Sequence, residues 1–383
     1  MAHKGARFVA SIIDYVERRG SVPLAQLPLT EVDALILCTL AYMPLEVAVS
    51  GEFDAGVPLS EVAWALLDCE ACSKRKGNTL AHDRRLLQAI EKSARFGAMR
   101  ATGFVDIYDE AAQEQFSAVT FLAGDEVFVA FRGTDGTIVG WKEDFNMSFE
   151  REVPAQRSAV NYAQTAHRAL GRPMTLGGHS KGGNLAVYAA LFAGEGAQDD
   201  IRMAYNFDGP GFNDPAIARR EAKEWARIRT IVPRGSLVGM LLWHSEPFSI
   251  VHSDGEGVLQ HDPYTWQVMG GRFVPADTRS LGSRYADATV RDWLANLPTA
   301  TRKKAIDGIY ELISSPRDHA LSDLMDAQSL FSILHKASAL DGETRRAIEK
   351  MLEMLALSAA EAVPELIGDA AGELAEHARR EIG

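Results

Sequence analysis

The chain has 383 residues, 46% of them hydrophobic, which is enough to bury a large core in one main domain with helical additions. Its formal net charge of −12 argues against binding to nucleic acid or to an anionic membrane surface through bulk electrostatics. No uncharged apolar run approaches the roughly 18 residues that span a bilayer, so we expect no stable membrane insertion.

The first 84 residues are helical in pattern. Apolar residues recur at helical spacing before residue 17, and Thr30 with Asp33 marks the start of a second helix. A third helical run follows a charged, basic stretch and ends near Ala98. We therefore expect residues 1–84 to form an N-terminal helical region that could serve as a cap.

The three cysteines, Cys38, Cys69 and Cys72, are an odd and sparse set that fits a reducing compartment. No signal-peptide apolar region follows the first methionine, so we expect a cytoplasmic protein. The Cys69 and Cys72 pair has neither a second cysteine pair nor a suitably spaced histidine, so we expect no metal site. The sequence indicates no cofactor.

The middle of the chain alternates strand-like and helix-like runs. Two strand-like runs, 119–122 and 127–131, flank a short turn sequence and predict a hairpin. Later strand-like runs end at Leu176, Phe207, Val232 and His252. This order predicts an α/β core over residues 85–298, followed by a C-terminal helical region over residues 299–383.

The second strand of the hairpin leads into the loop Arg132-Gly133-Thr134-Asp135. In an α/β-hydrolase the loop after an early strand supplies the second donor of the oxyanion hole, so Thr134 could give a backbone amide and a hydroxyl. The same residues also suit an ordinary turn that uses Gly133 and Asp135. We expect Arg132 to brace this loop by pairing with Asp144.

The most informative segment is Gly178-His179-Ser180-Lys181-Gly182, where a serine lies inside Gly-x-Ser-x-Gly between a strand-like and a helix-like run. The pattern is typical of a nucleophile elbow, a strained turn that exposes a serine hydroxyl. Ser180 is therefore a candidate nucleophile, and the Lys181 amide at the helix start can donate to an oxyanion. The Lys181 cation lies at the positive end of a helix dipole, so we expect solvent around it, or else a carboxylate or an anionic substrate group.

The triad histidine of an α/β-hydrolase follows the acid in chain order. The candidates are therefore His244, His252, His261 and three histidines near the C-terminus. His261 lies in a loop before Trp266 and is favoured. His252 at a strand end is the second choice, and His244 in an apolar segment suits a pocket or the core. The adjoining apolar segment 237–243 either lines an acyl pocket or belongs to the core.

Three phrases resemble the class 3 lipase group of α/β-hydrolases over roughly residues 85 to 275: Phe-Arg-Gly-Thr at 131–134, Trp-x-x-Asp at 141–144 and Gly-His-Ser-x-Gly-Gly at 178–183. The fuller phrases at 131–135 and 178–186, together with Gln260-His261-Asp262, resemble a bacterial lipase-like family of unassigned physiological role. The resemblance implies the α/β-hydrolase fold, with a mostly parallel central sheet flanked by helices. It also implies a serine-histidine-acid mechanism with His261 at the lipase position, but no particular substrate.

The acid is the point at which this chain departs from the class 3 lipases. That group carries an aspartate just before Val-Pro, whereas this chain offers Ser236 after Val232-Pro233. One strand earlier, Asp208 lies at a strand end, the alternative location in the pancreatic-type lipases. An aspartate before Gly-Pro is also a common turn former, and Asp254 is the reserve candidate.

We therefore expect a serine hydrolase that cleaves carboxylic esters of small molecules or lipids through an acyl-enzyme. Ser180 would attack the carbonyl, His261 would relay the proton and Asp208 would fix the imidazole tautomer. Thr134 and Lys181 would hold the oxyanion. A thioesterase, amidase or acyltransferase would use the same residues. The alternative that is not an enzyme is a catalytically silent α/β-hydrolase scaffold that binds a ligand or partner. The sequence leaves the oligomeric state open.

Overall fold

The computed structural model describes residues 10–73, 80–135, 137–220 and 222–280, with a few isolated residues after them (283–284, 300–301, 303–304, 307 and 342). The predicted C-terminal helical region over residues 299–383 lies almost entirely outside the described residues. The same holds for His319, His335 and His377.

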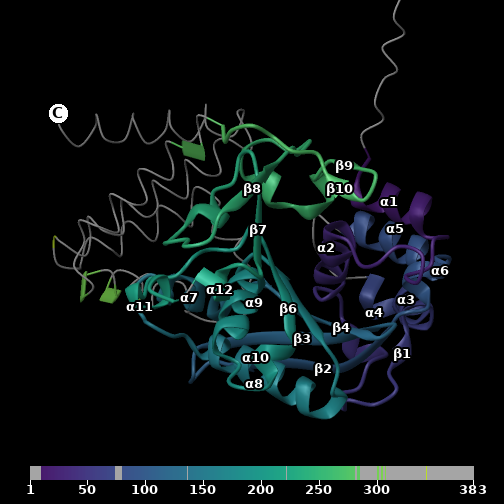
Figure 1. Cartoon of the computed structure of the whole chain (residues 1–383), viewed down its shortest axis with the longest axis horizontal. Coiled ribbons are helices and arrows are strands. Elements are labelled where there is room, and N and C mark those ends of the chain that lie inside the picture. Colours follow the sequence, from purple (N-terminus) through teal and green to yellow (C-terminus); the bar gives the residue numbers. More distant parts are fainter. Residues whose placement is uncertain are drawn as a thin grey trace, which may run out of the picture.

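The described residues build an eight-stranded central sheet in which the strands lie side by side in chain order (Figure 1). Neighbours from β1 to β4 are antiparallel, and neighbours from β4 to β8 are parallel. The strands are β1 (Val57–Pro58), β2 (Arg100–Asp109), β3 (Glu114–Ala123), β4 (Glu126–Phe131), β5 (Met174–His179), β6 (Ile201–Phe207), β7 (Ile228–Pro233) and β8 (Phe248–Val251). The predicted hairpin is confirmed as β3 and β4, and a second small hairpin joins β9 (Val268–Met269) to β10 (Arg272–Phe273).

Helices cover both faces of this sheet (Figure 1). On one face lie α1 (Ile12–Arg19), α2 (Glu31–Leu40), α3 (Leu59–Asp68), α4 (Glu70–Ser73), α5 (Leu80–Glu91) and α6 (Ala94–Gly97). The other face carries α8 (Pro154–Leu170), α9 (Lys181–Phe192) and α10 (Ala197–Asp200), while α7 (Ile138–Asn146), α11 (Pro215–Ala218) and α12 (Ala222–Trp225) lie in the connections between strands. Four 3₁₀ turns complete the set: η1 (Leu45–Val47), η2 (Val238–Met240), η3 (Gly257–His261) and η4 (Pro263–Thr265).

The alternation of side chains along β4 shows how the two layers form. Val127, Val129 and Phe131 pack with α8 and α9, whereas Phe128 and Ala130 pack with the N-terminal helices. Successive residues of a strand point to opposite faces, so one apolar run can serve two hydrophobic clusters. A mostly parallel sheet between two helical layers is the α/β-hydrolase architecture that the sequence predicts.

Helix α2 packs directly against the sheet rather than standing apart from it. Its predicted start is confirmed, because the Thr30 hydroxyl accepts from the Asp33 amide and the Asp33 carboxylate accepts from the Thr30 amide. From Val32 to Leu40 every residue is buried, and α2 contacts β4, β5 and β6. Helices before and after residue 84 share one hydrophobic cluster, while the domain boundary itself stays a prediction.

The two cysteines at the end of α3 differ from the expectation that the thiols are reduced. Cys69 and Cys72 form a disulfide there, with their Cα atoms 5.2 Å apart, inside the range that a disulfide can bridge. Cys38 is buried and free.

Candidate active site

Ser180 occupies a sharp turn between β5, which ends at His179, and α9, which begins at Lys181. Its backbone has φ 58° and ψ −135°, a conformation that costs free energy in a residue with a side chain and that is concentrated at functional sites. The turn fits because its glycines are packed against backbone: a Cβ at Gly178 would overlap Gly182, and one at Gly182 would overlap Phe131. The local geometry is that of the predicted nucleophile elbow.

Asp208 and His261 come together from segments 53 residues apart in the chain. His261 Nδ1 and Asp208 Oδ2 are 2.7 Å apart; the carboxylate is fully buried, whereas the imidazole is 24% exposed. Asp208 follows β6 directly with φ 52°, and the Ser180 amide donates to the carbonyl of Phe207 at 2.9 Å. The elbow and the Asp208–His261 pair therefore lie at the same edge of the sheet.

Ser236 stands at the position where the resemblance to class 3 lipases would place the acid, and its side chain contacts Asp208. The Ser236 hydroxyl donates to Asp208 Oδ1, so both carboxylate oxygens have a partner. Gly239 makes this fit possible, because a Cβ there would overlap the same Oδ1 atom. Ser236 thus holds the carboxylate in place, a role that sequence reasoning does not assign to it.

The alternative acid and histidines have other partners. Asp254 accepts from the Gln267 side chain at 2.5 Å on the surface. His244 Nδ1 lies 3.0 Å from buried Glu246, and the His252 backbone pairs with Val274 and Gln267. Of the candidates among the described residues, only His261 is paired with an acid at the edge of the sheet where Ser180 lies.

The loop after β4 is braced differently from the expected way. Arg132 pairs with Asp106 at 2.8 Å and with Asp135 at 3.3 Å, so the predicted contact between Arg132 and Asp144 is wrong. Instead the Thr134 hydroxyl donates to Asp144 at 2.5 Å. Burial raises the pKa of Asp144 to about 6, against the opposing effects of the Lys181 cation and the Thr134 hydrogen bond.

Lys181 is buried, with 1% of its side chain exposed, so the expectation of a solvated ammonium is wrong. Its Nζ donates to the Gln115 carbonyl at 2.7 Å, to Gln115 Oε1 at 2.8 Å and to Glu143 Oε2 at 2.9 Å. These three acceptors use all three ammonium protons. The other expected option, a compensating carboxylate, is the one that the structure shows.

Helix α7 therefore holds two separate parts of the site through adjacent side chains. Glu143 contacts Lys181, the residue after the nucleophile, and Asp144 contacts Thr134 on the opposite loop. Glu143 also accepts from the amides of Gln115 and Ala155, which ties α7 to β3 and to the start of α8. Among the described residues, neither the Thr134 amide nor the Lys181 amide has a hydrogen-bond acceptor.

Tyr42 is a site residue that sequence reasoning misses. Its hydroxyl contacts the Gly133 amide and His179, although it comes from the N-terminal part of the chain. Burial and the neighbouring His261 keep the pKa of His179 well below its ordinary value, so this imidazole is neutral. No local pattern around Tyr42 indicates the contact, because it depends on how α2 packs on the sheet.

The apolar segment 237–243 is partly buried and partly exposed. Met240 and Leu242 are buried, and Leu242 packs with Met147 and Val153, whereas Trp243 is 64% exposed. The Gly211 amide donates to the Leu241 carbonyl, so the segment lies beside the loop that follows Asp208. A role of this segment as an acyl pocket stays a prediction.

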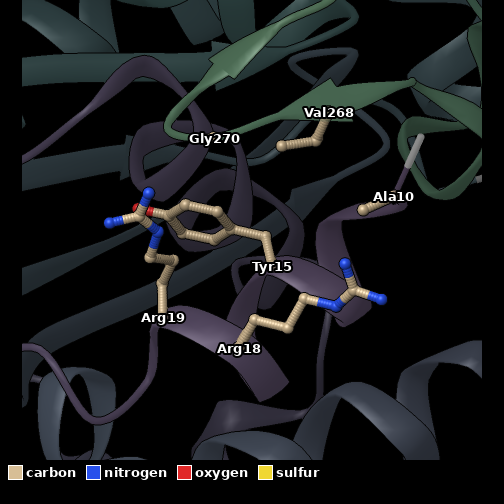
Figure 2. A pocket seen from close by; sticks show the side chains of 6 residues that line it. All are labelled: Ala10, Tyr15, Arg18, Arg19, Val268 and Gly270. Atoms are coloured by element: carbon tan, nitrogen blue, oxygen red, sulfur yellow. The ribbon is translucent and has the colours of Figure 1, made fainter. Parts of the chain in front are cut away.

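Three further features concern other kinds of site. A cavity of about 220 Å³ lies between α1 and β9, lined by residues other than those around Ser180 (Figure 2): Ala10, Tyr15, Arg18, Arg19, Val268 and Gly270. In the part of the chain that the structure describes, no cluster of three or more histidine, cysteine, aspartate or glutamate side chains is placed to hold a metal ion. The same part contains no helix with the length and hydropathy of a membrane span.

Several solved structures resemble this chain, whereas no curated protein matches it in sequence. One of them is lipase II from Rhizopus niveus (14% identity, TM-score 0.36, 64% of this chain and 85% of that chain covered). The chain is also similar to a mutant form of MDLA from Penicillium cyclopium (12% identity, TM-score 0.37, 65% of this chain and 86% of that chain covered). A Rhizomucor miehei lipase propeptide complex is similar as well (15% identity, TM-score 0.37, 72% of this chain and 76% of that chain covered). The model of the Mbeg1-like family matches residues 90–311, more than half of the chain, and the protein therefore belongs to the Mbeg1-like family.

Proposed function

We propose that this protein is a serine hydrolase that cleaves carboxylic esters through an acyl-enzyme intermediate. The observation that carries the proposal is the 2.7 Å contact between His261 Nδ1 and the fully buried Asp208, beside a serine held at positive φ. A carboxylate on Nδ1 fixes the tautomer in which Nε2 is free to accept a proton. A strained turn of this kind would present the Ser180 hydroxyl to that base.

The reaction follows from these positions. His261 takes the hydroxyl proton as Ser180 attacks the carbonyl carbon, and it returns the proton to the leaving alcohol when the acyl-enzyme forms. Water then attacks the acyl carbonyl carbon while His261 takes its proton. His261 returns this proton to the Ser180 oxygen as the acid leaves. Asp208 stays ionised and stabilises the imidazolium that forms in both steps.

The amides of Thr134 and Lys181 would stabilise the negative oxygen of each tetrahedral intermediate. Both amides lack an acceptor among the described residues, and Lys181 begins α9, where the helix dipole favours an anion. The Thr134 hydroxyl is engaged with Asp144, so the backbone amide is the donor that we assign to this loop. Loss of one such donor typically costs about 2.7 to 4 kcal/mol of transition-state stabilisation.

The substrate class that we assign is an ester of a small molecule or a lipid. The same residues would equally serve a thioesterase, an amidase or an acyltransferase, because all of these form an acyl-enzyme on serine. A panel of matched esters, thioesters and amides with one acyl group separates these reactions. We expect the highest kcat/KM with the esters.

A fluorophosphonate probe tests the nucleophile directly. We expect covalent labelling of the wild type, none of Ser180→Ala, and unchanged labelling of Ser253→Ala, a half-buried serine that pairs with Thr265. Peptide mapping should place the adduct on Ser180. A folded wild type that remains unlabelled would reject the proposal in favour of a silent scaffold that binds a ligand or partner.

A further inference from the structure

Tyr42 connects two loops of the candidate site that are far apart in sequence. It lies just after α2, and its hydroxyl accepts a hydrogen bond from the Gly133 amide at 3.1 Å. The same oxygen lies 3.1 Å from the His179 carbonyl and 3.2 Å from His179 Nδ1. One hydroxyl is thus shared between the loop that carries Thr134 and the residue before Ser180.

His179 extends this connection to the candidate triad histidine. Its Nε2 lies 2.8 Å from the carbonyl oxygen of His261, and the two rings are 4.4 Å apart. A carbonyl can only accept, so Nε2 carries the proton and Nδ1 is left as an acceptor for the Tyr42 hydroxyl. The single Tyr42 hydroxyl proton thus has two acceptors on His179, the carbonyl oxygen and Nδ1, and these contacts link Gly133 through Tyr42 and His179 to the backbone of His261.

The loop approaches Tyr42 and the elbow closely at Gly133. A Cβ at Gly133 would overlap the Tyr42 hydroxyl, and it would lie 2.7 Å from the His179 carbonyl oxygen and 3.0 Å from Ser180 Cβ. Glycine at 133 is what allows the loop to approach both Tyr42 and the elbow. A shift of the loop would therefore displace Tyr42 or His179 as well.

We infer that Tyr42 is a positioning residue that holds the oxyanion loop and the His261 loop in register with Ser180. This inference rests on the proposed function, although Tyr42 itself touches no reacting atom. The N-terminal helical region then has a defined part in the site, because it supplies the hydroxyl that joins the two loops. Tyr42 lies outside residues 90–311, the part matched by the family model.

The test compares Tyr42→Phe with Tyr162→Phe. The Tyr162 hydroxyl is also buried with two partners, Thr120 at 2.9 Å and the Gly103 carbonyl at 2.6 Å, and neither belongs to the candidate site. With a p-nitrophenyl ester, we expect Tyr42→Phe to lower kcat/KM by about tenfold to a hundredfold, mainly through kcat, because a lost hydrogen bond misplaces the transition-state contacts. A phenylboronic acid inhibitor, which forms a tetrahedral adduct with serine, should weaken by a similar factor.

Hydrogen exchange gives a readout that does not depend on activity. In Tyr42→Phe, peptides that contain Gly133 and peptides that contain His261 should both exchange faster than in the wild type, and Tyr162→Phe should leave both unchanged. Equal kinetics and equal exchange in the two variants would overturn the inference. If the wild type neither reacts with a fluorophosphonate nor cleaves esters, the proposed function fails, and the exchange of the two peptides alone decides whether Tyr42 couples the loops.

Discussion

At the scale of single residues, Asp208 is the acid that we propose for the triad. Its carboxylate is buried and is held from both sides, by His261 at Nδ1 and by the Ser236 hydroxyl. Two oriented partners fix the direction in which this carboxylate points. The imidazole of His261 is in turn held in one tautomer, which is the function that a triad acid performs.

Replacement of this acid by its amide tests the assignment. Asp208→Asn keeps the shape and tolerates the positive φ of 52°, but an amide can hold His261 in the wrong tautomer. We expect kcat to fall by about 10⁴-fold while the fold is retained. Steady-state ester hydrolysis measures the change, with circular dichroism as a check on folding. Asp254→Asn is the matched control and should keep wild-type kinetics; a loss there equal to that of Asp208→Asn would mean that the acid is wrongly assigned.

At the scale of the elements, α7 stabilises the site from one side. Its adjacent Glu143 and Asp144 side chains hold Lys181 and Thr134, which come from different strands' ends. The Lys181–Glu143 pair is almost completely shielded from water, with 1% and 0% of the side chains exposed. Removal of one partner from a buried pair leaves the other charge without compensation.

Lys181→Met should therefore lower the free energy of unfolding by about 3 to 5 kcal/mol, because it leaves the Glu143 carboxylate buried and unpaired. Urea unfolding at neutral pH measures the change. The exposed pair between Arg202 and Glu126 provides the comparison, and Arg202→Met should cost less than about 1 kcal/mol. Similar losses in the two variants would show that the buried pair is not the stabilising contact described above.

The elements themselves follow from local patterns, whereas the contacts at the site do not. The capping box at Thr30 and Asp33, the β3–β4 hairpin and the elbow at Ser180 are each determined by residues close together in sequence. The Lys181–Glu143 pair spans 38 residues and depends on the approach of α7 to α9. The contact between Ser236 and Asp208 likewise depends on two strand ends that lie side by side. The periodicity of the sequence does not indicate this neighbourhood.

At the scale of the whole molecule, buried titratable groups make the fold sensitive to pH. Burial is the main cause that lowers the pKa of His179 well below its ordinary value, so the folded protein keeps this imidazole neutral. In the unfolded chain His179 takes up a proton below about pH 6.5. The contribution of the neutral His179 imidazole to the free energy of unfolding is therefore fully present above that pH and is lost as the pH falls.

His179→Gln tests this dependence. The unfolding free energy of the wild type should fall relative to the variant by about 1.4 kcal/mol for each pH unit below 6.5, until the folded imidazole itself becomes protonated. Urea titrations at pH 7.5, 6 and 5 on both proteins measure the slope. Glutamine keeps an amide that can donate to the His261 carbonyl, so the comparison isolates the proton. Parallel stability curves over this range would contradict a neutral buried imidazole.

The agreement between strand order and chain order has a consequence for biosynthesis. Each strand from β2 to β8 pairs with the strand made just before it, so the sheet can grow one strand at a time as the chain leaves the ribosome. Helix α2 is different, because its buried surface is covered by β4, β5, β6 and β10, and β10 ends only at Phe273. A nascent chain must carry this apolar helix for more than 230 residues, from Leu40 to Phe273, before the last of these strands has been made. We therefore expect this apolar surface to need a chaperone during that interval of synthesis.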